Sequence, residues 1–342
     1  MKLQQNNIKK IIFDLDGVIT SEQSYWDAAA LMTYELIYSR DYYGNRDIDR
    51  EWCYKNLRLI FDIVFCGGRT IKAVKKLGVN TNWDLAYLVF CVTEYLMPHP
   101  ETFEQQLFES VCMFIDNMEI TPPELYVGVE GLVATVIPKE VGFFKRNGDG
   151  LWKELYDGFN TWYHGDGVID GTKAIEQPLL KLESIKETLQ KLKDKGYKLG
   201  IGTGRPTEEA LYPMRKWGLM EYFDENLCAY YNDVSNAESL VEKGVQLAKP
   251  HPFVFLKAAF GSEYSDKELL EKGVPVEKTE KCLVIGDAAS DMFAAQSGGF
   301  LFGAVLTGVT GENGRAFFEE NQADIILDSV LDLAESIDNA AV

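Results

Sequence analysis

KIIFDLDGVIT, residues 10–20, is the stretch that decides the fold. Its apolar run Ile11–Phe13 is typical of a buried parallel strand, and the strand ends at Asp14, Asp16 and Gly17. Ligands bind beyond the carboxyl ends of strands in doubly wound sheets. Two carboxylates two residues apart on an extended strand point to the same side. By itself the pair is weak evidence for a site and is more often a solvated turn, so the rest of the chain has to decide.

Composition narrows the classes of function. The chain has 342 residues, 46% of them hydrophobic, which is enough for two domains with ordinary cores. A formal net charge of −19 argues against nucleic acid and against an anionic membrane as partners. The N-terminus is polar, and no run of 18 apolar residues occurs. The six cysteines are scattered in apolar settings, so we expect free buried thiols and a cytoplasmic protein.

Short apolar runs that alternate with helical segments predict a parallel α/β sheet in the second half of the chain. The expected strands are residues 10–14, 197–202, 227–231, 282–285, 300–305 and 325–327. Residues 21–170 instead carry helical periodicity. The sequence therefore predicts a Rossmann-like, doubly wound α/β core from residues 1–20 and 171–342, with residues 21–170 inserted as a mainly helical domain.

Within the inserted block, residues 101–118 carry one apolar stripe at helical spacing, and Pro122 and Pro123 follow. Residues 151–164 indicate another helix, rich in aromatic residues that we expect in the core. Residues 127–141 are apolar and β-branched but contain Gly128, Gly131 and Pro138, which leaves strand and loop both open.

Two further strand ends carry groups suited to an anion. Thr203, Gly204 and Arg205 precede a helix, where a hydroxyl and free backbone N–H groups can bind phosphate. Thr203 is also compatible with simple helix capping. Lys249 lies in AKPHP, residues 248–252, whose prolines hold it on a stiff loop before a helix. The alternative for Lys249 is a solvated surface charge.

A fourth strand, CLVIG, ends at Asp287, and Asp291 follows one helical turn later. Mg²⁺ prefers carboxylate and carbonyl oxygens, which Asp14, the backbone of Asp16 and Asp287 can supply. Asp291 is expected to orient waters or to pair with Lys249. A helix cap is the alternative role for Asp287.

DLDGVIT, TGR, the lysine before proline and GDAASD occur in this order at strand ends and resemble the four motifs of the haloacid dehalogenase superfamily of phosphohydrolases. The resemblance covers residues 8–20 and 171–330. It implies a catalytic core with a cap domain at residues 21–170. Such caps are usually near half this length, so part of the block, within residues 85–150, is extra.

The resemblance implies a role for each motif. Asp14 would be the nucleophile that forms an aspartyl phosphate, and Asp16 the general acid and base. Thr203 and Lys249 would stabilise the phosphoryl group, and Gly204 and Arg205 would bind substrate. Mg²⁺ would be held by Asp14, Asp16, Asp287 and Asp291, and Arg69 of a cap loop would bind a second anionic group. These roles together imply a Mg²⁺-dependent phosphatase for a small phosphorylated metabolite.

Two alternatives remain at this point. DLDGVIT also occurs in β-phosphoglucomutases, which carry a histidine twelve residues after the nucleophile, where this chain has Trp26. A binding or scaffold protein that uses the enlarged cap is the other. The sequence names no substrate and leaves monomer and homodimer both open.

Overall fold

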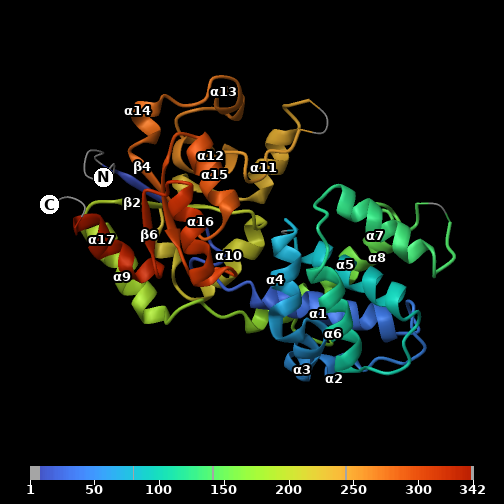
Figure 1. The fold of residues 1–342 in the computed structure, drawn as a ribbon. Helices are drawn as coiled ribbons and strands as arrows, with labels where there is room; N and C mark the ends of the chain where they lie inside the picture. The colour runs from blue at the N-terminus through green and yellow to red at the C-terminus, as the bar shows by residue number, and fades with distance from the viewer. Residues whose placement is uncertain (1–7, 80, 141, 243–244, 340–342) are drawn as a thin grey trace. The chain divides into compact units, whose positions relative to one another are not determined.

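The computed structural model describes residues 8–79, 81–140, 142–242 and 245–339, and it divides into two compact units. One unit contains the described residues up to Ser21 and those from Gln177 onward, and the other is Glu22–Glu176. The sequence placed the boundaries after residues 20 and 170. Figure 1 shows a layered α/β unit and a helical unit.

The first unit is built on one six-stranded sheet, in which every strand pair is parallel. The strand order β3-β2-β1-β4-β5-β6 confirms the doubly wound fold expected from the sequence. The expected strand at 227–231 is shorter than predicted, because Tyr231 already begins a helix. The strands are β1 (Lys10–Phe13), β2 (Lys198–Gly202), β3 (Cys228–Ala229), β4 (Cys282–Gly286), β5 (Leu301–Val305) and β6 (Ile325–Leu327).

Helices cover both faces of this sheet. Along β1, Ile11 and Phe13 pack into the cluster that α9, α10 and α17 complete, whereas Ile12 packs on the opposite side with α12 and α15. Successive side chains of the strand therefore pack into the two hydrophobic layers on opposite faces of the sheet. The helices are α9 (Leu182–Asp194), α10 (Thr207–Lys216), α11 (Tyr231–Glu238), α12 (Phe253–Phe260), α13 (Asp266–Glu271), α14 (Val276–Thr279), α15 (Ala289–Ser297), α16 (Arg315–Glu320) and α17 (Leu333–Asn339).

Strand register brings the sequence motifs to one edge of the sheet. Ile12 on β1 lies opposite Gly200 on β2 and Val284 on β4. Asp14 extends the ladder, since its N–H donates to the carbonyl of Ile285 at 2.8 Å. β1 is also the strand from which the order proceeds in both directions, which is the topological switch point of such sheets.

The second unit is helical, and its described residues contain no β-strand. Its central helix α1 packs against α3, α5 and α8 and is buried on nearly all sides, as the absence of a polar face requires. The helices are α1 (Gln23–Tyr38), α2 (Arg50–Lys55), α3 (Leu57–Val64), α4 (Arg69–Lys76), α5 (Asn82–Leu96), α6 (Gln105–Asp116), α7 (Glu124–Ala134) and α8 (Leu151–His164).

Two of these helices differ from the sequence expectation. The helix expected at 101–118 begins only at Gln105. The stretch 127–141, left open between strand and loop, belongs largely to α7, which buries Leu125, Val129 and Val133 at four-residue spacing. Gly128 and Gly131 lie on its exposed side, where a helix tolerates them. Residue 141 lies outside the described residues.

A buried carboxylate on α1 makes the stability of the helical unit depend on pH. Asp27 is 3% exposed, and it contacts the Gln23 amide at 2.8 Å and the Arg58 guanidinium at 3.7 Å. Burial raises the pKa of its carboxyl from 3.8 to about 6, with Asp62 adding to the shift. The folded state therefore holds this proton more tightly than the unfolded state does. Ionised Asp27 destabilises the fold above pH 6, and the penalty disappears as pH falls toward 4.

We therefore expect Asp27→Asn to raise the free energy of unfolding at pH 8 by about 2 kcal/mol, because the neutral amide avoids the buried charge. At pH 4 the same substitution should have little effect. Urea unfolding at the two pH values measures both quantities. Equal effects at pH 8 and pH 4, or a loss of stability at pH 8, would contradict the expectation.

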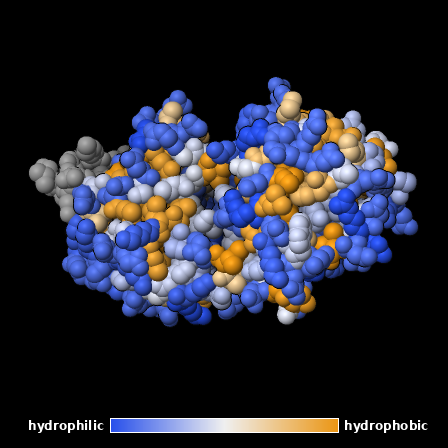
Figure 2. All heavy atoms as spheres, turned by 90° about the horizontal axis from the view of Figure 1, so that it is seen from below, coloured by the Kyte–Doolittle hydropathy of each residue, from blue (hydrophilic) through white to orange (hydrophobic). Residues whose placement is uncertain are grey.

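The surface carries apolar side chains in several separate areas. On the face in Figure 2 these areas are bounded by hydrophilic side chains. Val127, Met113 and Val276 are among the most exposed large apolar residues. Among the described residues no helix has the length and apolar character needed to cross a bilayer. The six cysteines are free, as the sequence predicted.

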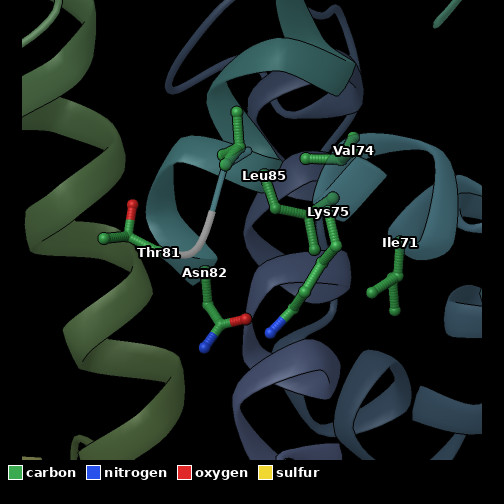
Figure 3. Close-up of a pocket in the computed structure, with 7 residues that line it drawn as sticks. Ile71, Val74, Lys75, Thr81, Asn82 and Leu85 are labelled. Atoms are coloured by element: carbon green, nitrogen blue, oxygen red, sulfur yellow. The ribbon is translucent and has the colours of Figure 1, made fainter. Parts of the chain in front are cut away.

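One small pocket lies between α4 and α5 of the helical unit (Figure 3). Its empty volume is about 160 Å³, below the range usual for small-molecule sites. Its one cation, Lys75, already binds both carboxylate oxygens of Glu22 at 2.8 and 3.0 Å. We therefore place the candidate site elsewhere, at the carboxyl edge of the sheet. The pocket is lined by Ile71, Val74, Lys75, Val79, Thr81, Asn82 and Leu85.

Candidate active site

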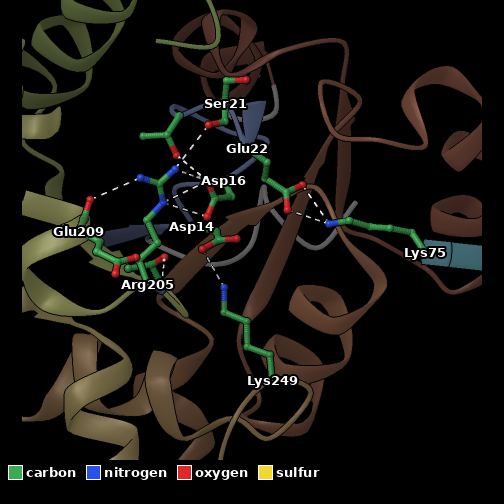
Figure 4. Close-up of polar contacts among 10 residues, drawn as sticks. Asp14, Asp16, Ser21, Glu22, Lys75, Arg205, Glu209 and Lys249 are labelled. Atoms are coloured by element: carbon green, nitrogen blue, oxygen red, sulfur yellow. Dashed lines mark hydrogen bonds and ion pairs between the residues drawn. The ribbon is translucent and has the colours of Figure 1, made fainter. Parts of the chain in front are cut away.

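Lys249 joins two of the motif aspartates. Its ammonium lies 2.8 Å from Oδ1 of Asp14 and 2.8 Å from Oδ1 of Asp291. Figure 4 shows the Lys249 side chain pointing at Asp14. The lysine side chain is only 12% exposed, so it is not the solvated surface charge considered from the sequence. Residues more than 230 positions apart therefore form one charged cluster, as the strand ends predicted.

Asp14, Asp287 and Asp291 also form a group that could hold a divalent cation. One carboxylate oxygen of each lies within 4.8 Å of the others. Such hard oxygen donors suit Mg²⁺ or a similar ion. Both oxygens of Asp291 already have donors, since Oδ1 contacts Lys249 and Oδ2 accepts from the backbone N–H groups of Asp287 and Ala288 at 3.3 and 3.2 Å. Asp291 is thus held by Lys249 and by two backbone N–H groups while one of its oxygens stays within 4.8 Å of those of Asp14 and Asp287.

Two glycines leave room for the Asp287 carboxylate. A Cβ at Gly308 would lie 1.8 Å from Oδ2 of Asp287, and one at Gly17 would lie 2.3 Å from its Cγ. Gly17 also has a φ of +73°, a conformation that side chains disfavour. The loop after β5 is tied to the first motif, because Thr307 Oγ1 donates to the carbonyl of Gly17 at 2.5 Å. Any side chain at Gly17 or Gly308 would displace Asp287.

Burial controls the charges of this cluster. Burial raises the pKa of Asp14 from 3.8 to about 7, an effect that Lys249 opposes and that Asp291 and Asp16 increase. For Lys249, burial lowers the pKa, but the charges of Asp14 and Asp291 outweigh it and hold the pKa above its ordinary value. The lysine therefore stays an ammonium. A cation bound between Asp14 and Asp287 would favour the ionised form of Asp14 as well.

Thr203 and Gly204 follow β2 and lie before α10. The Thr203 N–H donates to the carbonyl of Ala229 at 3.1 Å, and the residue is 1% exposed. Its hydroxyl oxygen accepts from the N–H of Arg205 at 3.2 Å, so it shapes the turn. Gly204 is exposed, with no atom within 4 Å of the position of a Cβ. The open backbone at this turn suits an anion.

Arg205 has a partner that the sequence did not predict. We expected it to bind substrate, but its buried guanidinium lies on the carboxylate of Asp16 (Figure 4). The other sequence-predicted cation, Arg69, begins α4 after Gly67 and Gly68 and forms an ion pair with Glu109 in the helical unit. Its role toward a substrate stays a prediction.

Sequence reasoning missed two features of this site and one buried carboxylate of the helical unit. The contact of Arg205 with Asp16 joins residues 189 positions apart and has no local signal. Asp27 is a buried carboxylate in the helical unit, and only its place on an apolar helix could have marked it. The glycines at 17 and 308 had a signal, since each stands in a motif-bearing loop, but the close approach to Asp287 appears only in the structure.

Comparison with known proteins gives the following similarities. A family model described as haloacid dehalogenase-like hydrolase matches residues 8–299. Pyrophosphatase PpaX of Bacillus cereus is 30% identical over 157 residues, which are 46% of this chain and 59% of that protein. The PpaX of Bacillus thuringiensis is 30% identical over 151 residues, 44% of this chain and 56% of that protein. This chain thus spans less than two thirds of the length of these curated relatives.

A solved structure is similar over a greater length. An X-ray structure from the Northeast Structural Genomics Consortium shares 26% identity and a TM-score of 0.81, and the match covers 97% of this chain and 99% of that one. The match supports the fold described above.

Proposed function

The chain belongs to the haloacid dehalogenase-like hydrolases, and on that premise we propose that it is a Mg²⁺-dependent phosphatase acting on a small phosphorylated compound. The observation that carries the proposal is the cluster in which Lys249 contacts Asp14 and Asp291. Carboxylate oxygens of Asp14, Asp287 and Asp291 lie within 4.8 Å of one another there, close enough to share one metal ion. A nucleophilic carboxylate, a buried ammonium and a cation site at one strand edge are the groups that phosphoryl transfer requires.

In this proposal Asp14 attacks phosphorus and forms an aspartyl phosphate. A carboxylate and a phosphate repel each other, and the ammonium of Lys249 at 2.8 Å offsets part of that repulsion. Mg²⁺, when held by Asp14, the Asp16 backbone and Asp287, supplies further positive charge to the phosphoryl oxygens. Thr203 and the backbone N–H groups before α10 hold these oxygens.

Asp16 is the proposed general acid and base. It lies two residues after Asp14 and, with Oδ1, accepts a hydrogen bond from the Thr20 hydroxyl at 3.0 Å. In the first step the leaving oxygen needs a proton from an acid if it would otherwise depart as a strongly basic anion, such as an alkoxide. In the second step a water molecule attacks phosphorus and gives its proton to a base.

The alternatives from the sequence are less well supported. Trp26 stands where β-phosphoglucomutases carry histidine, and this departure favours hydrolysis over the mutase reaction. A scaffold role does not require the ionic contacts of Lys249 or the glycines at Asp287. The curated relatives are named pyrophosphatases, which makes pyrophosphate one substrate to test. We further propose a cytoplasmic protein that acts as a monomer or homodimer, without nucleic-acid or membrane partners.

Phosphate release from p-nitrophenyl phosphate tests the proposal. The purified chain should hydrolyse it with Mg²⁺ and lose the activity with excess EDTA. A panel of phosphosugars, nucleotides, amino-acid phosphates and pyrophosphate then ranks the substrates. Conversion of a hexose 1-phosphate to its 6-phosphate without release of phosphate would favour the mutase. Metal binding with no turnover on any panel member would favour the scaffold.

Gly308 gives a test of the metal site that replaces none of the proposed ligand residues. Gly308→Ala would place a Cβ 1.8 Å from Oδ2 of Asp287, so this carboxylate has to move. We expect the Mg²⁺ concentration for half-maximal activity to rise by about 10- to 100-fold. Titration calorimetry with Mg²⁺ measures the same change without turnover.

Gly128→Ala is the matched control, because it makes the same substitution on α7 with no atom within 4 Å. It should leave the Mg²⁺ dependence unchanged. An unchanged Mg²⁺ affinity in a folded Gly308→Ala variant would remove Asp287 from the metal site.

A further inference from the structure

Thr307 connects the loop after β5 with the loop after β1. Its Oγ1 donates a hydrogen bond to the carbonyl of Gly17 at 2.5 Å, across 290 positions of chain. In the sheet β4 lies between β1 and β5, and Asp287 follows directly after β4. The hydrogen bond therefore joins the two loops that flank the strand carrying Asp287.

Both of these loops approach the carboxylate of Asp287 closely. A Cβ at Gly17 would lie 2.3 Å from Oδ2 and 2.8 Å from Oδ1 of Asp287. A Cβ at Gly308, the residue after Thr307, would lie 1.8 Å from Oδ2 and 2.9 Å from the Cβ of Asp287. The backbone at these two glycines therefore leaves the carboxylate little room to withdraw or to turn.

Each loop is also folded by its own backbone hydrogen bonds. The Gly17 N–H donates to the carbonyl of Thr20 at 2.9 Å, and the Gly311 N–H donates to the carbonyl of Gly308 at 3.1 Å. The Leu306 N–H donates to the carbonyl of Leu327 at 3.0 Å, which fixes the start of the loop after β5. Thr307 thus adds a link between two loops that already have defined shapes.

Mg²⁺ and Ca²⁺ make different demands on a carboxylate ligand. Mg²⁺ binds oxygens at about 2.1 Å in a near-ideal octahedron, whereas Ca²⁺ binds them at about 2.4 Å, with more ligands and often with both oxygens of one carboxylate. To bind Ca²⁺ equally well, Asp287 would have to withdraw or turn, which the backbone at Gly17 and Gly308 opposes. A carboxylate held in this way favours the smaller ion.

We propose that Thr307 is a positioning residue for the metal site, and that its hydrogen bond to Gly17 makes the site select Mg²⁺ over the larger Ca²⁺. The proposal rests on the metal-dependent function proposed above. It assigns the ion preference of the site to a residue that lies outside the four sequence motifs and is not itself a proposed metal ligand.

Metal titration of the unmodified chain gives the first test. Titration calorimetry without substrate should give a Kd for Ca²⁺ at least about tenfold higher than the Kd for Mg²⁺. Equal affinities, or binding of neither ion, would overturn the proposal. Because the titration involves no turnover, selective Mg²⁺ binding by a chain that hydrolyses no phosphate compound would support the role of Thr307 and refute the phosphatase function.

Thr307→Val tests the hydrogen bond, because valine keeps the branched shape of threonine and lacks the hydroxyl. We expect the Kd for Mg²⁺ to rise by about tenfold and the Kd for Ca²⁺ to change less than about threefold, so that the preference narrows. Thr307→Ser keeps a hydroxyl and should retain the parent preference. An equal loss of affinity for both ions, or an unchanged ratio in the folded valine variant, would overturn the proposal.

Thr310→Val is the matched control on the same loop. Thr310 is exposed, and its side chain makes no capping hydrogen bond to the short helix that follows. This variant should bind both ions as the parent does.

Thr307→Ala provides a second measurement if Thr307→Val does not fold, because it removes the same donor without placing a methyl group against the Gly17 carbonyl. The rise in melting temperature with each ion reports binding by the folded chain. In the parent, Mg²⁺ should raise the melting temperature more than Ca²⁺ does at the same concentration, and in Thr307→Ala this difference should shrink. A parent-like difference in Thr307→Ala would overturn the role of Thr307.

Discussion

Replacing Asp14 with asparagine is expected to lower kcat on p-nitrophenyl phosphate by about 10⁵-fold, the scale seen when a nucleophile is removed. The amide keeps the size of the side chain but has no negative oxygen with which to attack phosphorus. It also removes one anion from Lys249, which keeps its contact with Asp291. The variant should therefore fold. Stopped-flow and end-point assays of p-nitrophenolate release measure the loss.

Asp324→Asn is the matched control for that substitution. Asp324 accepts a hydrogen bond from the Phe302 N–H at 2.9 Å, just before β6, at the sheet edge away from the cluster. The Asp324→Asn variant should keep the activity of the parent enzyme on p-nitrophenyl phosphate. Intact-mass measurement of the quenched parent enzyme should show one added phosphoryl group that the Asp14→Asn variant lacks. Parent-level turnover by the Asp14→Asn variant would refute the assignment of the nucleophile.

The sequence predicted the sheet well because each core strand is a short apolar run followed by a polar motif residue. The run before Asp14 and CLVIG before Asp287 are β1 and β4, and they pair in parallel. The strand at β3 was predicted too long. Its apolar character continues into Tyr231, which begins α11, and a strand and a short buried helix cannot be told apart by hydrophobicity alone.

The helical unit was harder to predict from sequence. At 127–141, the β-branched residues and two glycines suggested a strand or a loop. The burial of Leu125, Val129 and Val133 at helical spacing outweighs this local preference in α7. The expected helix at 101–118 starts at Gln105, because apolar residues outside a helix can pack against the same core. Tertiary packing, rather than the intrinsic helix propensity of the residues, therefore determines where α6 and α7 lie in the sequence.

The site was predicted as a set of motifs but not as a set of contacts. Strand ends at one sheet edge must lie close together, so the cluster of Asp14, Lys249 and Asp291 followed from topology. The contact of Lys249 with Asp291 was one of the two roles expected for Asp291, but the partners of Asp14 and Asp16 did not follow. Lys249 and Arg205 both come from loops at that edge, and only the coordinates pair the first with Asp14 and the second with Asp16.

Lys249→Met is expected to lower kcat/KM by about 10³-fold, because it removes the ammonium that contacts both Asp14 and Asp291. Methionine has a similar length, and the lysine stem already lies near the ring of Phe255, with its Nζ 4.8 Å from the ring centroid. The loss of kcat/KM therefore reflects the missing positive charge more than a change in packing. Three carboxylates within 4.8 Å then have no ammonium between them. The metal-free variant should unfold at a lower temperature than the parent.

Lys257→Met provides the comparison that isolates the site. Lys257 is also partly buried and forms an ion pair with Asp266 at 2.6 Å, on α12 but outside the cluster. Its loss should change the melting temperature slightly and leave kcat/KM within about twofold, since a partly exposed pair contributes little. If Lys249→Met also stayed within tenfold of the parent, the ammonium would not be offsetting the repulsion between Asp14 and phosphate. Both variants lose one positive charge, although Lys249→Met breaks two ion pairs and Lys257→Met breaks one. The difference in kcat/KM between them therefore measures what an ammonium beside Asp14 and Asp291 contributes.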